Sequence, residues 1–508
     1  MCKKYNIFSN KSILIILLLS FTFFILPLSI FSQENTEEHE INELIEDQET
    51  SEELNLIKFK ISEIYQKRNL FADITYTAMG ILNANMFVNV LGRIMDLPHA
   101  HISFKQMWEN IKKPNWYWET GDRYFNNQVG HSYHGYAYFA GARISGFTFY
   151  ESMLAIPLGS LMWEVLLEPH AAYNDLITTT IGGISIGEML HRLFLEINMS
   201  SFWAKIGGFF VSPINTYYKM YNRPLRETGG GNLYYLSFRT GIEKTFIFFP
   251  EHEEHEESWK YPGAYLDVNI SYSNPFIQES KIPYKHFDFF MGFSTNIATC
   301  QLVIITDGYL VSYNPINKEK SSMSTGLTLH YDFFLATNDL VDNLGYGNIP
   351  FSSNALGWSL KHKYISSEKL HLETKLHGAV VLWGNSMYNG DFTVDVSETG
   401  VHLGNTFGSY GIGENIKFSF LLSHKKAGRL DFILTAYHMF SIPVTARHSK
   451  GNVFFIHSSL SYDIPLGKVI GLGARVTYWG LFGFYDSASN VNRRLISTSL
   501  FANFKLPN

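Results

Sequence analysis

From Asn232 to the C-terminus, long segments alternate between apolar and polar residues, and this alternation constrains the fold more than any other feature. In Leu266–Tyr272 and Leu327–Phe333 every second residue is apolar, and the residues between them are polar. Ile496–Phe504 alternates in the same way, with Phe501 as an apolar exception. A period of two places successive side chains on opposite faces of a strand. These segments therefore predict a β-sheet with one apolar and one polar face.

The number and spacing of these segments predict a closed barrel. We expect about twelve strands, because bacterial membrane barrels have even numbers of antiparallel strands. Short connections alternate with long ones, which is typical of a barrel with short periplasmic turns and long external loops. A soluble periplasmic protein with two packed sheets is the alternative, but the many strongly apolar faces favour a membrane barrel. The predicted strands lie near residues 232–246, 261–274, 283–296, 301–311, 322–335, 355–365, 368–383, 411–423, 428–440, 452–463, 468–482 and 493–505.

The N-terminus has the pattern of an export signal. Lysines precede the apolar run Ile13–Ile30, and Ser32 offers a small residue for cleavage. An uncleaved membrane anchor is the alternative, since the apolar run is long for a signal peptide. We predict a signal peptide over residues 1–32 and a flexible acidic leader over residues 33–60. The rest of the chain is therefore expected to be exported, with the bacterial outer membrane as its destination.

Composition excludes two classes of protein. The net charge is -6 at pH 7, so the chain lacks the broad basic surface that nucleic acid binding requires. Cysteine occurs only at Cys2, which would leave with the signal peptide, and at Cys300, so a disulfide framework is excluded. Aromatic residues make up 16% and charged residues 17% of the chain. This balance suits a protein with both a core and a lipid-facing surface.

Between the leader and the barrel, residues 61–227 have the period of helices. Asp175 is predicted as a helix N-cap, and Pro157 is expected to kink its helix or to divide it in two. The run Gly229–Gly231 marks the boundary with a barrel domain over residues 228–508. The overall prediction is an α+β membrane protein whose helical domain plugs the barrel or caps its periplasmic side. The predicted helices are Leu54–Met95, Ile102–Lys112, Tyr136–Arg143, Phe147–Leu167, Asp175–Ile197 and Ser200–Tyr221.

The helical domain carries most of the charged and imidazole residues that lie in apolar surroundings. Glu188 and His191 are three residues apart and share one helical face, so they could act as a base or as metal ligands, with Glu164 as an acid or third ligand. These three residues are the catalytic candidates. The preferred interpretation is that such groups pair and fasten the helices together, because an isolated buried charge is costly. Further candidates for binding or pairing are His131, His134, Glu168, Asp175 and Arg192.

One short motif has the spelling of a serine nucleophile. The segment Gly183–Gly187 fits Gly-x-Ser-x-Gly, a pattern that requires a strand before the serine and a helix after it. Its surroundings have a helical period instead. The preferred interpretation is that Gly182, Gly183, Ser185 and Gly187 form a stripe of small residues that lets a neighbouring helix approach closely.

Three segments between Asn115 and Leu193 carry more specific motifs, and they read HSYHGYAYFAGARISGFTFYES, GSLMWEVLLEP and NDLITTTIGGISIGEMLHR. They resemble a bacterial envelope family described only as domain of unknown function 3943. In this chain Ser132 stands where the first motif of that family would have proline. The resemblance implies an outer-membrane location and a barrel after the helices, and it implies no established activity.

Together these features predict an integral outer-membrane barrel with a structural or transport-related role. The alternative is an outer-membrane enzyme that acts on a lipid or glycolipid through Glu164, Glu188 and His191. The expected partners are outer-membrane lipid and the barrel-assembly machinery. Whether the chain is an enzyme, and which cofactor, metal, solute or oligomeric state it has, does not follow from the sequence.

Overall fold

The computed structural model describes most of the helical region and the barrel. The predicted signal peptide (residues 1–32) and acidic leader (residues 33–60) lie outside the described residues. The described ranges are 70–94, 100–112, 116–118, 124–197, 201–220, 232–248, 262–296, 300–337, 349–367, 369–389, 406–444 and 449–505.

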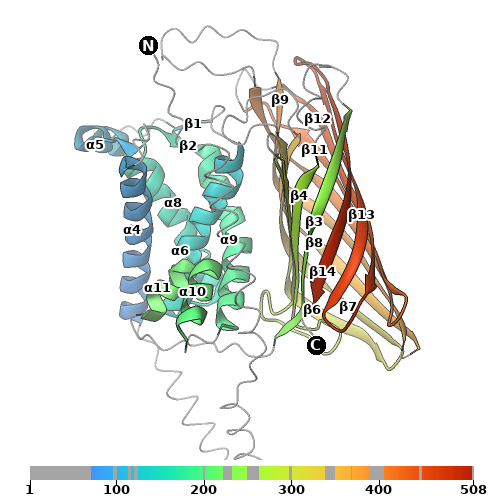
Figure 1. The fold of residues 1–508 in the computed structure, drawn as a ribbon. Helices are drawn as coiled ribbons and strands as arrows, with labels where there is room; N and C mark the ends of the chain where they lie inside the picture. Colours follow the sequence, from blue (N-terminus) through green and yellow to red (C-terminus); the bar gives the residue numbers. More distant parts are fainter. Residues whose placement is uncertain are drawn as a thin grey trace, which may run out of the picture.

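Twelve antiparallel strands form one closed barrel (Figure 1). Each strand pairs with its neighbours in the chain, and the last strand pairs with the first to close the sheet. The predicted barrel of about twelve strands is therefore confirmed, and the alternative of two packed sheets is wrong. Closure leaves the sheet without an open edge. The strands are β3 (Leu233–Phe248), β4 (Gly263–Tyr272), β5 (Phe287–Thr295), β6 (Cys300–Lys318), β7 (Ser321–Thr337), β8 (Ile349–Ser367), β9 (Leu370–Asn389), β10 (Thr406–His424), β11 (Gly428–Ser441), β12 (Gly451–Pro465), β13 (Ile470–Tyr485) and β14 (Val491–Lys505).

The alternation of the sequence sorts side chains between the lumen and the outer wall. His330 and Asp332 of β7 turn inward, and the ammonium group of Lys417 of β10 contacts both. Strands β8 and β9 lie between β7 and β10, so these side chains can meet only inside the barrel. Tyr331 and Phe333 alternate with them and therefore point outward.

The N-terminal region is helical, as predicted. The predicted middle helix is divided in two, and Pro157 lies in the first turn of the second part, where its missing N–H is tolerated. The prediction that Asp175 is an N-cap is wrong, because the helix begins at Tyr173 and Asp175 lies in its first turn. The helices are α4 (Leu70–Ile94), α5 (Phe104–Lys112), α6 (His131–Ser145), α7 (Phe149–Ser152), α8 (Ala155–Leu166), α9 (Tyr173–Leu195), α10 (Phe202–Val211) and α11 (Pro213–Met220), with a π-helix η3 (Asn126–Gly130) and two paired short strands, β1 (Trp116–Tyr117) and β2 (Ala171–Ala172).

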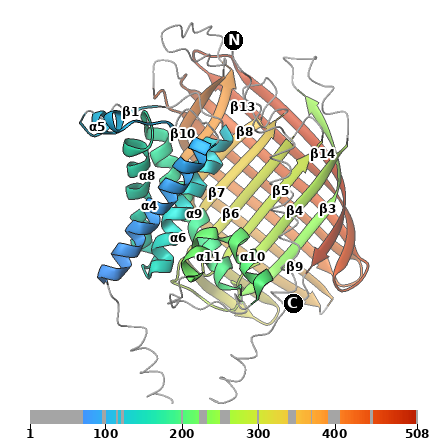
Figure 2. The same cartoon turned by 60° about the vertical axis from the view of Figure 1, so that its left-hand side comes forward.

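The helices pack against the outer wall of the barrel, and two views show them beside it (Figures 1 and 2). Tyr124 stacks on Phe333 with ring centroids 5.5 Å apart, and the Tyr331 hydroxyl donates to the Gln128 carbonyl oxygen at 2.9 Å. Both barrel residues belong to the outward set of β7. The prediction of a helical plug is therefore wrong, because the helices bind the outer face of the wall and side chains of the barrel occupy its lumen.

Helix α9 runs along the outer wall of the barrel. At one end, Trp118 stacks on Trp383 of β9 with ring centroids 5.9 Å apart, and it also lies against Tyr173 of α9. At the other end, the Tyr272 hydroxyl donates to the Glu196 carboxylate at 2.6 Å. Tyr272 is the last residue of β4 and lies toward the end of the barrel that has the short turns. Strand β9 starts at that end, so Trp383, in its second half, lies toward the opposite end.

The described residues form two apolar cores. The larger core lies between the helices and the outer wall and includes Phe194 and Leu329. The smaller core lies inside the barrel and includes Phe334 of β7 and Trp479 of β13. The rings of these two residues are 6.0 Å apart although their strands lie on opposite sides of the barrel. The first core holds the helices on the wall, and the second narrows the lumen.

Helices α6 and α9 approach so closely that their contact requires glycine. A Cβ atom on Gly183 would lie 2.7 Å from the Gly135 Cα atom, and one on Gly187 would lie 2.6 Å from the Phe139 ring. Larger residues would push the helices apart. The interpretation of this segment as a stripe of small residues is therefore confirmed. Ser185 is buried in the middle of α9, which excludes a strand-to-helix nucleophile turn.

Candidate functional site

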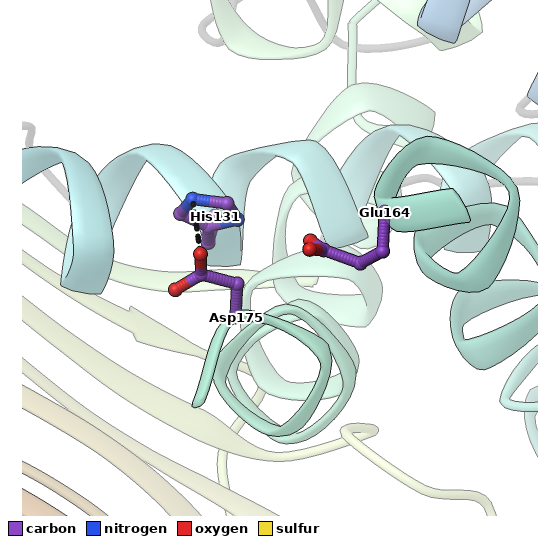
Figure 3. A group of neighbouring side chains, drawn as sticks. All are labelled: His131, Glu164 and Asp175. Carbon is purple, nitrogen blue, oxygen red and sulfur yellow. Dashed lines mark ion pairs between the residues drawn. The ribbon is translucent and has the colours of Figure 1, made fainter. Parts of the chain in front are cut away.

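Three side chains from different helices meet near the first turn of α9 (Figure 3). They are His131 at the start of α6, Glu164 of α8 and Asp175 of α9. One potential ligand atom of each residue lies within 4.8 Å of the other two, and His131 Nε2 is 3.7 Å from Asp175 Oδ2. The two acids are buried, whereas His131 is partly exposed. We name these three residues the carboxylate–imidazole cluster.

Neighbouring donors orient both carboxylates of the cluster. The side-chain amides of Asn127 and Asn174 donate to Asp175 Oδ1 at 3.0 and 2.7 Å. The backbone N–H of Ala172 donates to Glu164 Oε2 at 2.8 Å. Ala172 belongs to β2, so the short pairing of β1 with β2 helps to place this donor. These bonds limit the directions in which the carboxylates can turn.

The π-helix η3 connects the cluster to the barrel wall. The side-chain carbonyl of Gln128 accepts from the Ser352 hydroxyl at 2.7 Å, and its backbone carbonyl accepts from Tyr331. The Gln128 amide then donates to Asn127 Oδ1 at 2.6 Å, and Asn127 donates to Asp175. A continuous path of hydrogen bonds therefore runs from the outer wall to the cluster. Single-turn π-helices are frequent at functional sites.

A second imidazole lies one helical turn further along α6. His134 Nε2 is 2.9 Å from the Tyr138 hydroxyl, which donates to the side-chain carbonyl of Asn85 in α4. His131 Nδ1 faces the Thr179 hydroxyl of α9 at 3.3 Å. The two histidines of the HSYHG motif therefore point to different partners, and the cluster contains His131 but not His134.

The donor types of the cluster are those of a divalent-metal site. Imidazole and carboxylate groups bind Zn²⁺, Mn²⁺ and Fe²⁺, and three protein ligands leave positions for water or a substrate. Ligands of one ion, each at about 2.0–2.2 Å, lie at most about 4.4 Å apart, so the cluster needs only a small contraction to coordinate a metal. The amide donors of Asn127 and Asn174 are placed as outer partners of metal ligands commonly are.

Glu188 belongs to a different group, which it forms with two arginines. Arg143 donates to both Glu188 carboxylate oxygens, at 2.7 and 3.2 Å, and Arg192 Nη2 is 2.8 Å from Glu188 Oε1. Arg192 Nε also donates to the Pro283 carbonyl oxygen at 3.1 Å. We name Arg143, Glu188 and Arg192 the arginine clamp. The clamp joins α6, α9 and the connection between β4 and β5.

The fold separates Glu164 from Glu188 and His191. Asp175, which lies with Glu164, precedes Glu188 by thirteen residues in α9, or roughly 20 Å at the helical rise. The His191 ring faces the side-chain amide of Asn215 in α11 at 2.9 Å. The predicted grouping of Glu164 with Glu188 and His191 is therefore not formed.

Sequence reasoning missed several residues that now have clear positions. Arg143 was the hardest to find, because its partner Glu188 is 45 residues away. The sequence did contain an indication of its role, because an arginine in an apolar helix requires a partner. Asn127 and Gln128 gave no comparable signal. Glu168, which was a candidate, contributes its backbone carbonyl oxygen to the Asn110 amide at 2.9 Å.

The lumen contains a third polar group, which the sequence did not reveal as a group. Lys417 Nζ is 2.8 Å from both Asp307 Oδ1 and Asp332 Oδ1, and Arg239 donates to Asp431 at 2.9 Å. The two members of each ion pair lie on strands that are not neighbours, so the ion pairs cross the interior. A small pocket is lined by residues that include Glu243, His457, Arg475 and Trp479.

Comparison with protein families covers the helical domain and not the barrel. Residues 115–214 match the family described as Domain of unknown function (DUF3943). The DUF3943 segment includes the carboxylate–imidazole cluster, the arginine clamp and η3, and it ends within α11. The predicted resemblance is therefore confirmed. No curated protein matches the chain with significance.

The solved structures that match include outer-membrane barrels. The NanC porin is 10% identical, covers 53% of this chain and 100% of its own, and has a TM-score of 0.25. The outer membrane phospholipase A from Escherichia coli is 9% identical, covers 53% and 97%, and has a TM-score of 0.23. The outer membrane channel DcaP of Acinetobacter baumannii is 10% identical, covers 54% and 96%, and has a TM-score of 0.20. These scores are too low to carry an argument about function.

Proposed function

We propose that this chain is an integral outer-membrane protein whose barrel anchors the helical domain and does not conduct solutes. The part of the outer wall that the helices leave uncovered is apolar. Ile416, Val476 and Leu500 are 52%, 49% and 62% exposed, and they come from three different strands. A wide exposed apolar surface is unfavourable in water and is the normal exterior of a membrane barrel.

The contacts inside the barrel support an anchor rather than a pore. Lys417 and Arg239 make ion pairs across the lumen, and Phe334 meets Trp479 from the opposite wall. Such contacts fill the space that a channel would need for water. The meeting of Phe334 with Trp479 is the observation on which this proposal depends most.

Single-molecule conductance in planar bilayers tests the proposal. The purified protein is expected to give no stable open-channel current, because aromatic rings from both walls meet in the lumen. The double variant Phe334→Ala/Trp479→Ala is expected to conduct, whereas the matched outward-facing variant Leu500→Ala is not. Steady conductance of the unaltered protein would show that the lumen is a pore.

A second candidate function depends on the carboxylate–imidazole cluster. His131, Glu164 and Asp175 would hold a divalent metal that activates water for hydrolysis of a membrane lipid or glycolipid. The specific observation in its favour is that amide donors orient both acids toward a shared position beside a partly exposed imidazole. Ionisable groups within an apolar helical bundle are candidate functional sites for the same physical reason that makes them costly.

Metal titration tests this second function independently of any substrate. The purified protein is expected to bind one Zn²⁺ or Mn²⁺ per chain, measured by calorimetry. His131→Ala/Asp175→Ala is expected to lose this binding, whereas His134→Ala, which alters the neighbouring imidazole only, retains it. Equal binding by all three proteins would exclude the cluster as the metal site.

A further inference from the structure

We propose that the helical domain lies in the same lipid layer as the barrel, with the outer face of α4 in contact with hydrocarbon chains. This inference rests on the proposed membrane location of the barrel. The ligand is therefore a membrane lipid, recognised through its acyl chains. Helix α4 has 25 residues, which correspond to about 37 Å, enough to cross a hydrocarbon core of about 30 Å.

The polarity of α4 is reversed relative to a helix on a soluble protein. Asp73, Asn85 and Asn89 are buried on its inner face against the other helices and their connections. A soluble surface helix would direct such residues to water and its apolar residues to the core. Thr75, Asn83 and Arg93 are the exposed polar residues of α4, and Arg93 lies at the C-terminal end of the helix. The large exposed residues of α4 are Leu70, Phe71, Ile74, Tyr76, Met79, Leu82, Met86, Phe87, Val90, Leu91 and Ile94.

Burial distinguishes α4 from the apolar core helix of a soluble protein. The most apolar window of α4 has a mean hydropathy of 1.2, yet only 22% of that window is buried. A core helix of similar hydropathy would be mostly covered by protein. Phe87, at 69% exposed, has the surroundings of a lipid-facing side chain rather than a core residue.

The apolar surface continues beyond α4. Leu158 of α8 and Phe209 of α10 are also more than half exposed, so three helices contribute to it. The domain also extends along the wall, from Trp118, which joins Trp383 of β9 to the start of α9, to Glu196 at the end of α9, which binds Tyr272 of β4. This surface is therefore continuous in depth with the apolar wall of the barrel. Its extent over several helices favours lipid over a single partner helix.

The placement in lipid gives the carboxylate–imidazole cluster a particular environment. Helices would separate its two acids from water, and the low dielectric would strengthen every interaction among them. A lipid could approach His131 by moving sideways within the membrane, without leaving it. The path of hydrogen bonds through Gln128 would then connect two bodies that share one bilayer.

Site-directed spin labelling of the full-length protein in proteoliposomes tests this placement. The background is Cys2→Ala/Cys300→Ala, because these are the two cysteines of the chain. Single cysteines replace Phe87 or Met79 in α4, or Leu158 in α8, and each is labelled. Ile416→Cys on the outward face of β10 and Lys426→Cys in the turn after β10 are the controls. Retention of the barrel is verified for each variant by its heat-dependent migration in gels.

Labels on Phe87→Cys, Met79→Cys and Leu158→Cys are expected to be as accessible to oxygen, and as protected from a polar nickel reagent, as the label at position 416. If they are instead as accessible to the nickel reagent as the label at position 426, the helices lie in water. If both reagents are excluded, another protein surface covers the helices. Either result would overturn the inference. If the label at position 416 is itself accessible to the nickel reagent, the proposed membrane barrel is contradicted. This control therefore distinguishes failure of the proposed membrane barrel from failure of the inference about the helices.

Discussion

The carboxylate–imidazole cluster and the arginine clamp lie in the same helical domain but have opposite charge arrangements. In the clamp, Arg143 and Arg192 surround the single carboxylate of Glu188. In the cluster, two carboxylates face one imidazole and are held by neutral amides. The clamp therefore compensates its acid with fixed cations, whereas the cluster concentrates acids around a position that a metal ion can share.

This difference indicates separate roles for two groups that look alike in the sequence. A buried acid paired with arginines contributes to structure, because its charge is already balanced. Two oriented acids with a histidine have donor atoms that suit a divalent metal. Proximity in sequence does not predict the role, since Glu188 and Asp175 belong to one helix.

Removing the acid of the clamp should have the largest effect on stability. Glu188→Ala leaves Arg143 and Arg192 buried without their shared carboxylate, and we expect a loss of about 3–5 kcal/mol in the free energy of unfolding. The matched substitution in the cluster, Glu164→Gln, should cost about 1 kcal/mol, because it removes a charge without leaving a buried cation alone. Thermal unfolding in detergent, followed by circular dichroism, measures both. Equal losses would contradict the distinction between the two groups.

Acidification should destabilise the connection between β4 and β5. In this connection the Pro283 carbonyl oxygen accepts a hydrogen bond from Arg192. Burial lowers the pKa of His286 in this connection to about 4, and the bond from its ring to the Gln278 carbonyl oxygen opposes the shift only in part. The folded protein thus keeps His286 neutral while the unfolded chain, with a pKa of about 6.5, takes up a proton. Stability is therefore complete above pH 6.5 and falls as the pH drops toward 4, by at most about 3 kcal/mol.

Hydrogen exchange of the backbone amides in residues 273–286 measures this pH dependence. Protection should decrease between pH 6.5 and pH 4, and the decrease should be weaker in His286→Gln, which keeps a donor for the Gln278 carbonyl oxygen. A decrease of the same size in both proteins would show that another group is responsible.

The smallest effect should come from the outer partner of the cluster. Asn127→Ala removes an amide that orients Asp175, and we expect metal affinity to fall by about 10- to 100-fold. Asn215→Ala, which removes the amide facing His191, should leave metal affinity unchanged. Calorimetric titration with Zn²⁺ compares the two variants with the unaltered protein. An equal decrease in both would indicate that the effect comes from general loosening of the helices.

The barrel was predictable in detail because its signal is local. The strand over residues 428–440 was placed almost at the observed bounds, and β14 was placed within two residues. The alternation of a residue with its neighbours in the sequence is enough to predict the face of the strand on which its side chain lies. For the candidate site, the sequence predicted the residues that take part but not which of them lie together. His131, Glu164 and Asp175 were identified individually, but helical periods do not say which faces of separate helices meet.

The amino-acid sequence by itself determined the strands of the barrel and the division of their side chains into two faces, because these follow from short-range periodicity. Only the tertiary structure decided that the helices bind the outer wall. The outward face of β7 is equally apolar whether lipid or a helix covers it, so its sequence cannot distinguish the two. Tertiary packing also decided that Asp175 joins His131 and Glu164 while Glu188, on the same helix, joins two arginines.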